Sequence, residues 1–345
     1  MSAARRDPSV RRMAHTVLMP GFCGTGVPPW LERAITDEGL ASVLYFAPNL
    51  TEDPAGLSAR LHGLRPDLLV ASDEEGGRVT RLHAGAGSPY PAHGELGAAD
   101  DIAHTRGVAA AMGRDLRAAG IDAALAPVVD VNVNPANPVI GPRAFGAEPA
   151  AVAAHGAAFT AGLHEAGLLS AAKHFPGHGD TRTDSHVDLP VIDIDMATLR
   201  ARELVPFRAA VRTGVDMVMV GHIRIPALDD APASVSPRAY ALLRDEVEFR
   251  GVAITDALDM RGLARHTGAG SVLEGVARGA VAALSAGADL LCLGNPYTAR
   301  AGDEEMFAGT RDRLLEGVAA GAVPVERLAE AAGRVERLLA ARTRT

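Results

Sequence analysis

The stretch LLSAAKHFPGHGDTRTDSH, residues 168–186, decides the fold, because an apolar run passes directly into a dense group of ionisable side chains. Its first half has the composition of a buried strand, and Pro176, Gly177 and Gly179 then turn the chain. Similar apolar runs lie at 15–22, 41–49, 67–77, 122–135, 216–226, 251–260 and 288–296. They are nearly continuous rather than alternating, which is typical of parallel strands covered on both faces or lining a barrel.

Helical patterns lie between these runs. Over 100–119, apolar residues recur every four positions and Gly120 follows as a stop signal, and a second amphipathic pattern covers 324–341. Eight strands alternating with helices favour a barrel over an open doubly wound sheet. No linker, low-complexity segment or sequence repeat is found. We therefore predict an α/β fold, a single-domain (β/α)8 TIM-type barrel over 1–345, with roughly residues 1–14 as a flexible N-terminal extension.

The bulk composition favours a small-molecule substrate. A net charge of −8 without a long basic run argues against a nucleic-acid or anionic-membrane partner. The first residues lack a signal-peptide core, and no apolar run reaches the roughly 18 residues of a membrane span, so a cytoplasmic protein is expected. Cys23 and Cys292 are predicted to be buried thiols. No G-x-G-x-x-G or P-loop pattern follows a strand, and no cofactor is predicted.

Polar residues stand where the apolar runs end. In a barrel the carboxyl ends of the strands share one face, so these residues are expected to line a common pocket. Taken singly, each has the alternative role of a strand-end group satisfied by loop amides. The residues are Asp73, Asp130, Lys173, His174, His222 and Asp256.

The segment from 177 to about 190 has no periodic pattern, and such a long loop in a compact domain is usually functional or disordered. Within it, Asp184 can orient His186 and stabilise its protonated form, which suits acid/base catalysis near neutral pH. The rival hypothesis is zinc or another transition metal bound by histidines 174, 178 and 186 with Asp180 or Asp184. Lys173, the only lysine of the chain, disfavours zinc because it brings a cation to the place of the metal. We predict no metal.

Asp256 has the features of a nucleophile, because a carboxylate at the end of a buried strand is held rigidly. Retaining glycosidases attack the anomeric carbon with such a carboxylate, next to a proton donor. Arg81, Arg143 and Asp73 supply the donors and acceptors that a polyhydroxylated ring requires. Their alternative role is a salt-bridge network closing the barrel mouth.

Five stretches of the chain together resemble the bacterial β-N-acetylglucosaminidase branch of family 3 glycoside hydrolases. They are DEEGGRVTR, APVVDVNVNPANPVIGPRAF, AKHFPGHGDTRTDSHVDLP, VMVGHI with PALDDAPASVSP, and GVAITDALDM. The resemblance implies a TIM-type barrel and a retaining double displacement through a covalent glycosyl-enzyme. It makes Asp256 the nucleophile and His186, paired with Asp184, the acid/base. The sugar-binding positions implied are Asp73, Arg81, Arg143, Lys173 and His174, with His222 a weaker candidate.

The same resemblance separates this chain from two-domain β-glucosidases of the family, whose proton donor lies on another domain. Two departures, Glu74 where Gln or His is more usual and Ala144 in place of Ser, leave the substrate preference open. The expected substrate is a small N-acetylglucosaminide, including muropeptide fragments of cell-wall recycling. Three alternatives remain: phosphorolysis of the same glycosides, a β-glucosidase, and a sugar-binding barrel without turnover. His178 and Asp180 are expected to shape the loop.

Overall fold

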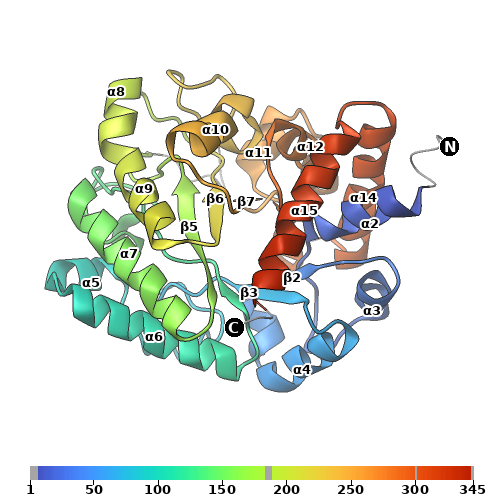
Figure 1. Cartoon of the computed structure of the whole chain (residues 1–345), viewed down its shortest axis with the longest axis horizontal. Helices are drawn as coiled ribbons and strands as arrows, with labels where there is room; N and C mark the ends of the chain where they lie inside the picture. Colours follow the sequence, from blue (N-terminus) through green and yellow to red (C-terminus); the bar gives the residue numbers. More distant parts are fainter. Residues whose placement is uncertain (1–6, 183–188, 300, 343–345) are drawn as a thin grey trace.

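The computed structural model of the protein describes residues 7–182, 189–299 and 301–342. Within these residues, eight parallel strands alternate with helices along the chain (Figure 1). Each strand lies inside one of the eight predicted apolar runs. The strands are β1 (Leu18–Met19), β2 (Ser42–Tyr45), β3 (Leu69–Ser72), β4 (Ala123–Ala124), β5 (Leu169–Phe175), β6 (Met217–Val220), β7 (Val252–Thr255) and β8 (Leu291–Cys292).

Helices begin at residues that suit a first turn. Proline opens α2, α3, α4 and α7, and the Asp7, Asp53 and Asp101 side chains accept backbone N–H groups of the turns that follow. The predicted helices at 100–119 and 324–341 are confirmed as α6 and α15. The helices are α2 (Pro8–Thr16), α3 (Pro29–Thr36), α4 (Pro54–Leu64), α5 (His93–Ala99), α6 (Ile102–Ala118), α7 (Pro149–Glu165), α8 (Met196–Thr198), α9 (Leu204–Thr213), α10 (Pro237–Ala241), α11 (Arg261–His266), α12 (Val272–Ala286), α13 (Pro296–Ala299), α14 (Asp303–Ala319) and α15 (Val325–Arg342).

Strand pairing follows the chain order. Strands β2 to β7 form a six-stranded parallel sheet, and β1 pairs in parallel with β8. Isolated parallel bridges, Gly21 with Leu44 and Ile254 with Leu290, lie at the two seams between these sheets. The fold is therefore an α/β arrangement with a curled parallel sheet, which is consistent with the predicted eight-stranded barrel.

Alternate residues of the strands face two different cores. One cluster takes a residue from every strand region, as expected for side chains that fill the interior of a curled sheet. The residues between them, such as Val43, Val70 and Val218, join a second cluster with the helices. The first cluster includes Met19, Leu44, Leu69, Ala71, Ala123, Leu125, Leu169, Ala171, Met217, Met219, Val252, Ile254, Leu290 and Cys292.

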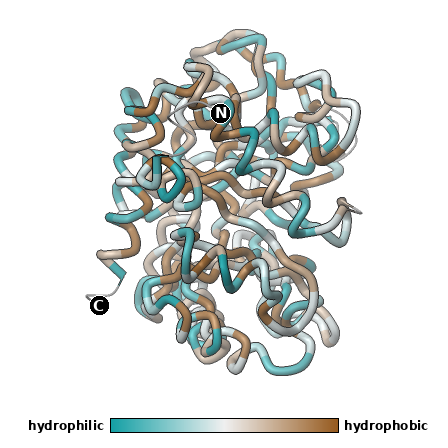
Figure 2. The backbone as a smooth tube through the Cα atoms, turned by 90° about the vertical axis from the view of Figure 1, so that its right-hand side faces the viewer, coloured by the Kyte–Doolittle hydropathy of each residue, from teal (hydrophilic) through white to brown (hydrophobic). Residues whose placement is uncertain are grey.

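The helices lie outside the strands. Helices α6, α7 and α9 pack side by side, with α7 and α9 against β5, on the left of Figure 1. Apolar segments run through the middle of the molecule in Figure 2, with hydrophilic positions mainly on the outer turns. None of the described helices is both long and apolar enough to cross a bilayer.

Two predictions about individual segments are wrong. Residues 8–14 belong to helix α2 rather than to a flexible extension, because its apolar side chains Val10 and Ala14 are buried in the helix-side core. Cys23 is exposed, because it lies in the loop after β1, whereas Cys292 is buried as predicted.

A short motif, Gly-x-Asp, which was not predicted to have a structural role, precedes β4, β6 and β8. The carboxylates of Asp122, Asp216 and Asp289 each accept a backbone N–H from the neighbouring strand, at 2.9, 2.9 and 3.0 Å. The N–H groups belong to Val70 of β3, Ser170 of β5 and Ala253 of β7. Each aspartate thus fixes the register between its own strand and the preceding one, at the amino ends of the strands.

These aspartates differ in how they are neutralised. Asp289 is fully buried among Arg244, Arg327 and Arg334, the last two from the region of α15. Asp216 retains 20% side-chain exposure and pairs with His164 at 2.8 Å. Removing a buried charge from among its counter-charges costs far more than removing a partly exposed one.

We therefore expect Asp289→Asn to lower the free energy of unfolding by about 3 kcal/mol, because three arginines lose their counter-charge. The matched Asp216→Asn change should cost about 1 kcal/mol, since the amide oxygen still accepts the Ser170 N–H and the histidine can stay neutral. Urea denaturation of both variants measures the difference. Equal losses would contradict this account of the Gly-x-Asp motif.

Candidate active site

A cavity of about 1090 Å³ opens at the carboxyl ends of the strands, as the barrel prediction requires. Six of the predicted site residues line it together, although they come from four regions far apart in the sequence. The predicted acid/base residues Asp184 and His186 lie outside the described residues. The six are Asp73, Arg81, Arg143, Lys173, His174 and Asp256.

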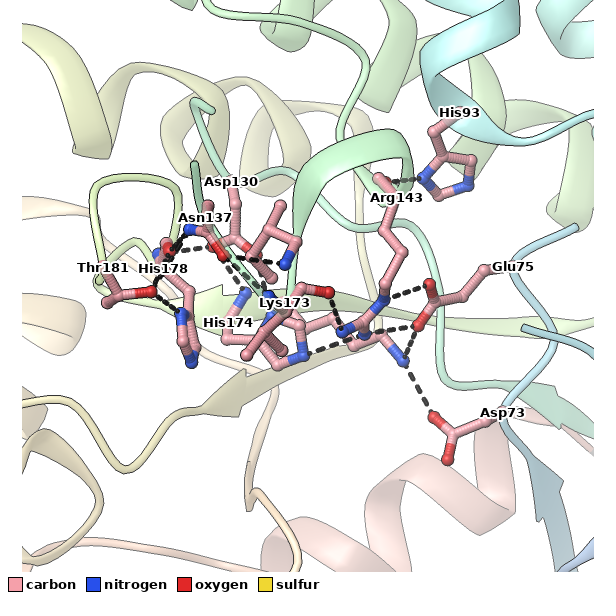
Figure 3. Close-up of polar contacts among 12 residues, drawn as sticks. Asp73, Glu75, His93, Asp130, Asn137, Arg143, Lys173, His174, His178 and Thr181 are labelled. Carbon is pink, nitrogen blue, oxygen red and sulfur yellow. Dashed lines mark hydrogen bonds and ion pairs between the residues drawn. The ribbon is translucent and has the colours of Figure 1, made fainter. Parts of the chain in front are cut away.

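Four side chains form a cluster of charges in the cavity wall, in which Lys173 and Glu75 are buried and Asp73 and Arg143 are partly buried (Figure 3). Lys173 Nζ contacts Asp73 Oδ1 at 2.8 Å and Glu75 Oε1 at 2.6 Å. Arg143 donates to both oxygens of Glu75, at 2.8 Å each. The two cations Lys173 and Arg143 are thus held beside the two carboxylates Asp73 and Glu75. These ion pairs fix the positions of the charged donors and acceptors that a polar ligand could bind. We call Asp73, Glu75, Arg143 and Lys173 the charge cluster.

The charge cluster keeps its carboxylates ionised. Burial alone would raise the pKa of Asp73, but the charges of Lys173 and Arg81 outweigh burial and lower it. The pKa of Glu75 lies well below its usual range, because Arg143 and Lys173 again outweigh burial. Burial would lower the pKa of Lys173, yet Asp73 and Glu75 raise it. All of these groups are therefore charged near neutral pH.

The ring of His174, the residue after Lys173, is oriented by the carboxylate of Asp130. Asp130 Oδ2 lies 2.7 Å from His174 Nδ1, and its Oδ1 accepts the backbone N–H groups of His174 and His178. The ionised Asp130 can only accept, so His174 Nδ1 carries a hydrogen and Nε2 faces Arg143 at 3.4 Å. Asp130, fully buried, is thus a support for the predicted sugar ligand His174 rather than a ligand itself.

His178 and Asp180 hold the turn that follows. His178 Nδ1 lies 2.7 Å from Thr181 Oγ1, and burial lowers the pKa of His178 to about 4. Arg202 joins Asp180 and Glu203, at 2.7 Å each. A Cβ at Gly177 would lie 2.4 Å from Glu203 Oε2, so only glycine fits there. These contacts agree with the loop-shaping role expected for His178 and Asp180.

Asp256 follows β7 and lies in the cavity with 7% of its surface exposed. Its Oδ1 accepts the backbone N–H of Ala257 at 2.8 Å. Burial would raise the pKa of Asp256, but the nearby rings of His174 and His222, the Ala257 N–H and Lys173 together outweigh burial and lower it. An ionised, immobilised carboxylate beside the charge cluster has the properties of a nucleophile.

Sequence reasoning missed Glu75 and placed His222 wrongly. Glu75 stands in the quoted DEEGGRVTR stretch, but only the fold reveals that its partners are Arg143 and Lys173. His222 does not line the cavity, and both its ring nitrogens bind protein atoms. The signal available in the sequence was the position of Glu75 in this stretch, two residues after the predicted ligand Asp73.

Two alternative roles can be compared with this geometry. Arg81 and Arg143 do form salt bridges, with Asp73 at 3.4 Å and with Glu75, so the network that was the alternative to sugar binding is present in the cavity wall. Among residues 7–182, 189–299 and 301–342, no group of three or more His, Cys, Asp or Glu side chains could hold a metal ion.

The rest of the cavity wall is largely apolar. It includes Phe46, Pro48, Met260, Val272 and Tyr297. The volume of about 1090 Å³ slightly exceeds the usual range for small-molecule sites, about 300–1,000 Å³. The cavity therefore has room beyond the charged wall for a further part of a ligand.

A curled parallel sheet with a pocket of charged side chains at the carboxyl ends of its strands is the usual arrangement of an α/β enzyme. The family model of the glycosyl hydrolase family 3 N terminal domain matches residues 31–338. The chain belongs to this family of glycoside hydrolases, as the sequence motifs predicted.

Similar proteins carry consistent names. A beta-hexosaminidase from Stenotrophomonas maltophilia (strain K279a) is 36% identical over 290 residues, which are 81% of this chain and 84% of that protein. Beta-hexosaminidase A from Pseudoalteromonas piscicida is 36% identical over 266 residues, 69% of this chain and 44% of its own length. The structure of a family 3 beta-N-acetylglucosaminidase from Paenibacillus sp. str. FPU-7 matches with a TM-score of 0.88 and 36% identity, over 96% of this chain and 62% of that chain. The chain thus spans less than two thirds of the latter two proteins.

Proposed function

We propose that the protein is a retaining β-N-acetylglucosaminidase that hydrolyses terminal β-linked N-acetylglucosamine. The observation that carries this proposal is the ionised Asp256 carboxylate, fixed in the cavity beside the charge cluster. The names of the similar proteins support the N-acetyl preference. We further infer that the curled sheet closes as a (β/α)8 barrel.

In the proposed first step, an Asp256 oxygen attacks the anomeric carbon and the bond to the leaving oxygen breaks. His186, oriented by Asp184, gives its proton to that oxygen. In the second step His186 removes a proton from water, the water oxygen bonds to the anomeric carbon, and Asp256 leaves as a carboxylate. The aglycone occupies the apolar part of the cavity.

The charge cluster supports this division of roles. Asp73 and Glu75 are held ionised by Lys173 and the arginines, so neither is suited to donate a proton near neutral pH. They are suited to accept hydrogen bonds from sugar hydroxyls, while Lys173, Arg143 and Arg81 donate. The assignment of the proton donor to His186 follows from the family motif.

A panel of p-nitrophenyl glycosides, with and without phosphate, tests the proposal. Release from the N-acetyl-β-glucosaminide should exceed release from the β-glucoside by about 10²-fold, because a site built for the acetamido group leaves polar atoms unpaired without it. The reverse preference would contradict the N-acetyl assignment. Formation of N-acetylglucosamine 1-phosphate in phosphate buffer would show that the enzyme is a phosphorylase. If no p-nitrophenol is released from any glycoside, the alternative of a sugar-binding barrel without turnover would be favoured.

A further inference from the structure

His222, which follows β6, is fully buried. It was a weaker candidate for sugar binding, yet it is not among the residues that line the cavity. Strand β6 neighbours β7 in the sheet, with Val220 opposite Thr255, the residue before Asp256. His222 therefore lies beside the segment that carries the proposed nucleophile.

Both ring nitrogens of His222 have partners whose chemistry fixes the position of the hydrogen. Nε2 lies 2.9 Å from the carbonyl oxygen of Ala257, which can only accept, so Nε2 is the donor. Nδ1 lies 2.6 Å from Ser234 Oγ, and in the neutral ring this nitrogen accepts the serine hydroxyl hydrogen. Ser234 itself is held by its backbone N–H, which donates to the Gly221 carbonyl at 3.2 Å.

The carbonyl that His222 binds belongs to the residue that contacts the nucleophile. The Ala257 N–H donates to Asp256 Oδ1 at 2.8 Å, and the Asp256 N–H donates to the Val220 carbonyl at 3.0 Å. One residue later, the Leu258 N–H donates to the Cys292 carbonyl at 3.0 Å. The backbone around Asp256 is thus fixed by β6 and β8, and the ring of His222 adds a side-chain tie to the Ala257 carbonyl.

We propose that His222 is a positioning residue for the nucleophile. By holding the Ala257 carbonyl, it fixes the backbone that directs the Ala257 N–H at Asp256 Oδ1, and so keeps the carboxylate aimed at the anomeric carbon. Ser234 holds the ring in the required tautomer. This inference rests on the proposed function, because it gives His222 a role only if Asp256 attacks the sugar.

Covalent trapping separates positioning from binding. An activated fluorosugar of the N-acetylglucosamine type forms a long-lived glycosyl-enzyme, and its kinetics give a maximal labelling rate and an apparent binding constant. His222→Leu should lower the maximal rate by about 10²-fold, since a misplacement of about 1 Å has that effect, and leave the binding constant within threefold. His222→Gln, whose amide N–H can replace the ring donor to Ala257, should recover most of the rate.

Two further variants make the test independent of folding. Ser234→Ala removes the tautomer lock without changing the ring, and should lower the maximal rate by about tenfold. His155→Leu is the matched control, because His155 is equally buried but binds Thr105 on another part of the fold. It should change thermal stability without changing the labelling rate.

The outcomes are distinguishable. If the wild-type protein is not labelled, the proposed function fails. If the wild type is labelled while His222→Leu and Ser234→Ala react at its rate, the positioning role is overturned. A weaker binding constant at an unchanged maximal rate would also overturn it, because His222 would then act on substrate binding.

Discussion

An Asp256→Asn variant is expected to lose at least about 10³-fold in kcat on the N-acetyl-β-glucosaminide, equivalent to about 4 kcal/mol of activation free energy. The amide has nearly the shape of the carboxylate but cannot form the glycosyl ester. Its oxygen can still accept the Ala257 N–H, so the fold should be retained. Initial rates and circular dichroism measure the two effects.

Asp259→Asn is the matched control for this variant, because Asp259 lines the same cavity three residues later. Its carboxylate accepts the Asn295 N–H at 3.2 Å, and the proposed mechanism gives it no role. We expect a loss of less than about tenfold. A residual rate of Asp256→Asn within tenfold of wild type would rule out Asp256 as the nucleophile.

The second large effect is expected from Glu75→Gln, which removes the shared counter-charge of Arg143 and Lys173. These cations would then be buried 2.8 and 2.6 Å from an amide, and their orientation toward the sugar would relax. We expect kcat/KM to fall by about 10²-fold, or about 2.7 kcal/mol, mainly through KM.

Glu74→Gln, the adjacent position, is the matched control. The Glu74 carboxylate accepts the N–H groups of Arg81 and Leu82 through Oε2, and an amide oxygen can accept the same bonds. Burial raises the pKa of Glu74, so replacing it with a neutral amide costs little. Similar losses of kcat/KM in both variants would contradict the role of Glu75 as the shared counter-charge of Arg143 and Lys173.

The charge cluster also predicts an acid dependence of stability. The folded-state pKa values of Asp73 and Glu75 are lowered, so their contribution is fully present above their unfolded values of about 4. It is lost as the pH falls through the folded values, where the unfolded chain binds more protons. The free energy of unfolding should therefore fall below about pH 4, and less steeply in Glu75→Gln.

The strands were predictable because each lies in a nearly continuous apolar run. Their lengths were not: β4 covers only Ala123–Ala124 of the run at 122–135, because the chain leaves the sheet before Asp130. The role of the Gly-x-Asp motif in fixing the strand register could not be predicted. A three-residue pattern that recurs at distant positions is too short to be recognised as a repeat.

The predicted ligands share one cavity because the carboxyl ends of the strands lie on the same face of the fold. This could be predicted without knowing the distances between the side chains. Partners could not be predicted in the same way. Lys173 meets Asp73 100 positions away, and Arg143 meets Glu75 68 positions away. His222 illustrates the opposite error, because a polar residue at a strand end can face the neighbouring strand instead of the cavity.

The most direct measurement of the central claim is peptide mapping of the trapped glycosyl-enzyme by mass spectrometry. The account predicts one N-acetylglucosaminyl-type adduct per chain, on the peptide that contains Asp256, and no adduct in Asp256→Asn. An adduct on Asp73, Glu75 or another carboxylate, or turnover with inversion and no adduct, would contradict it.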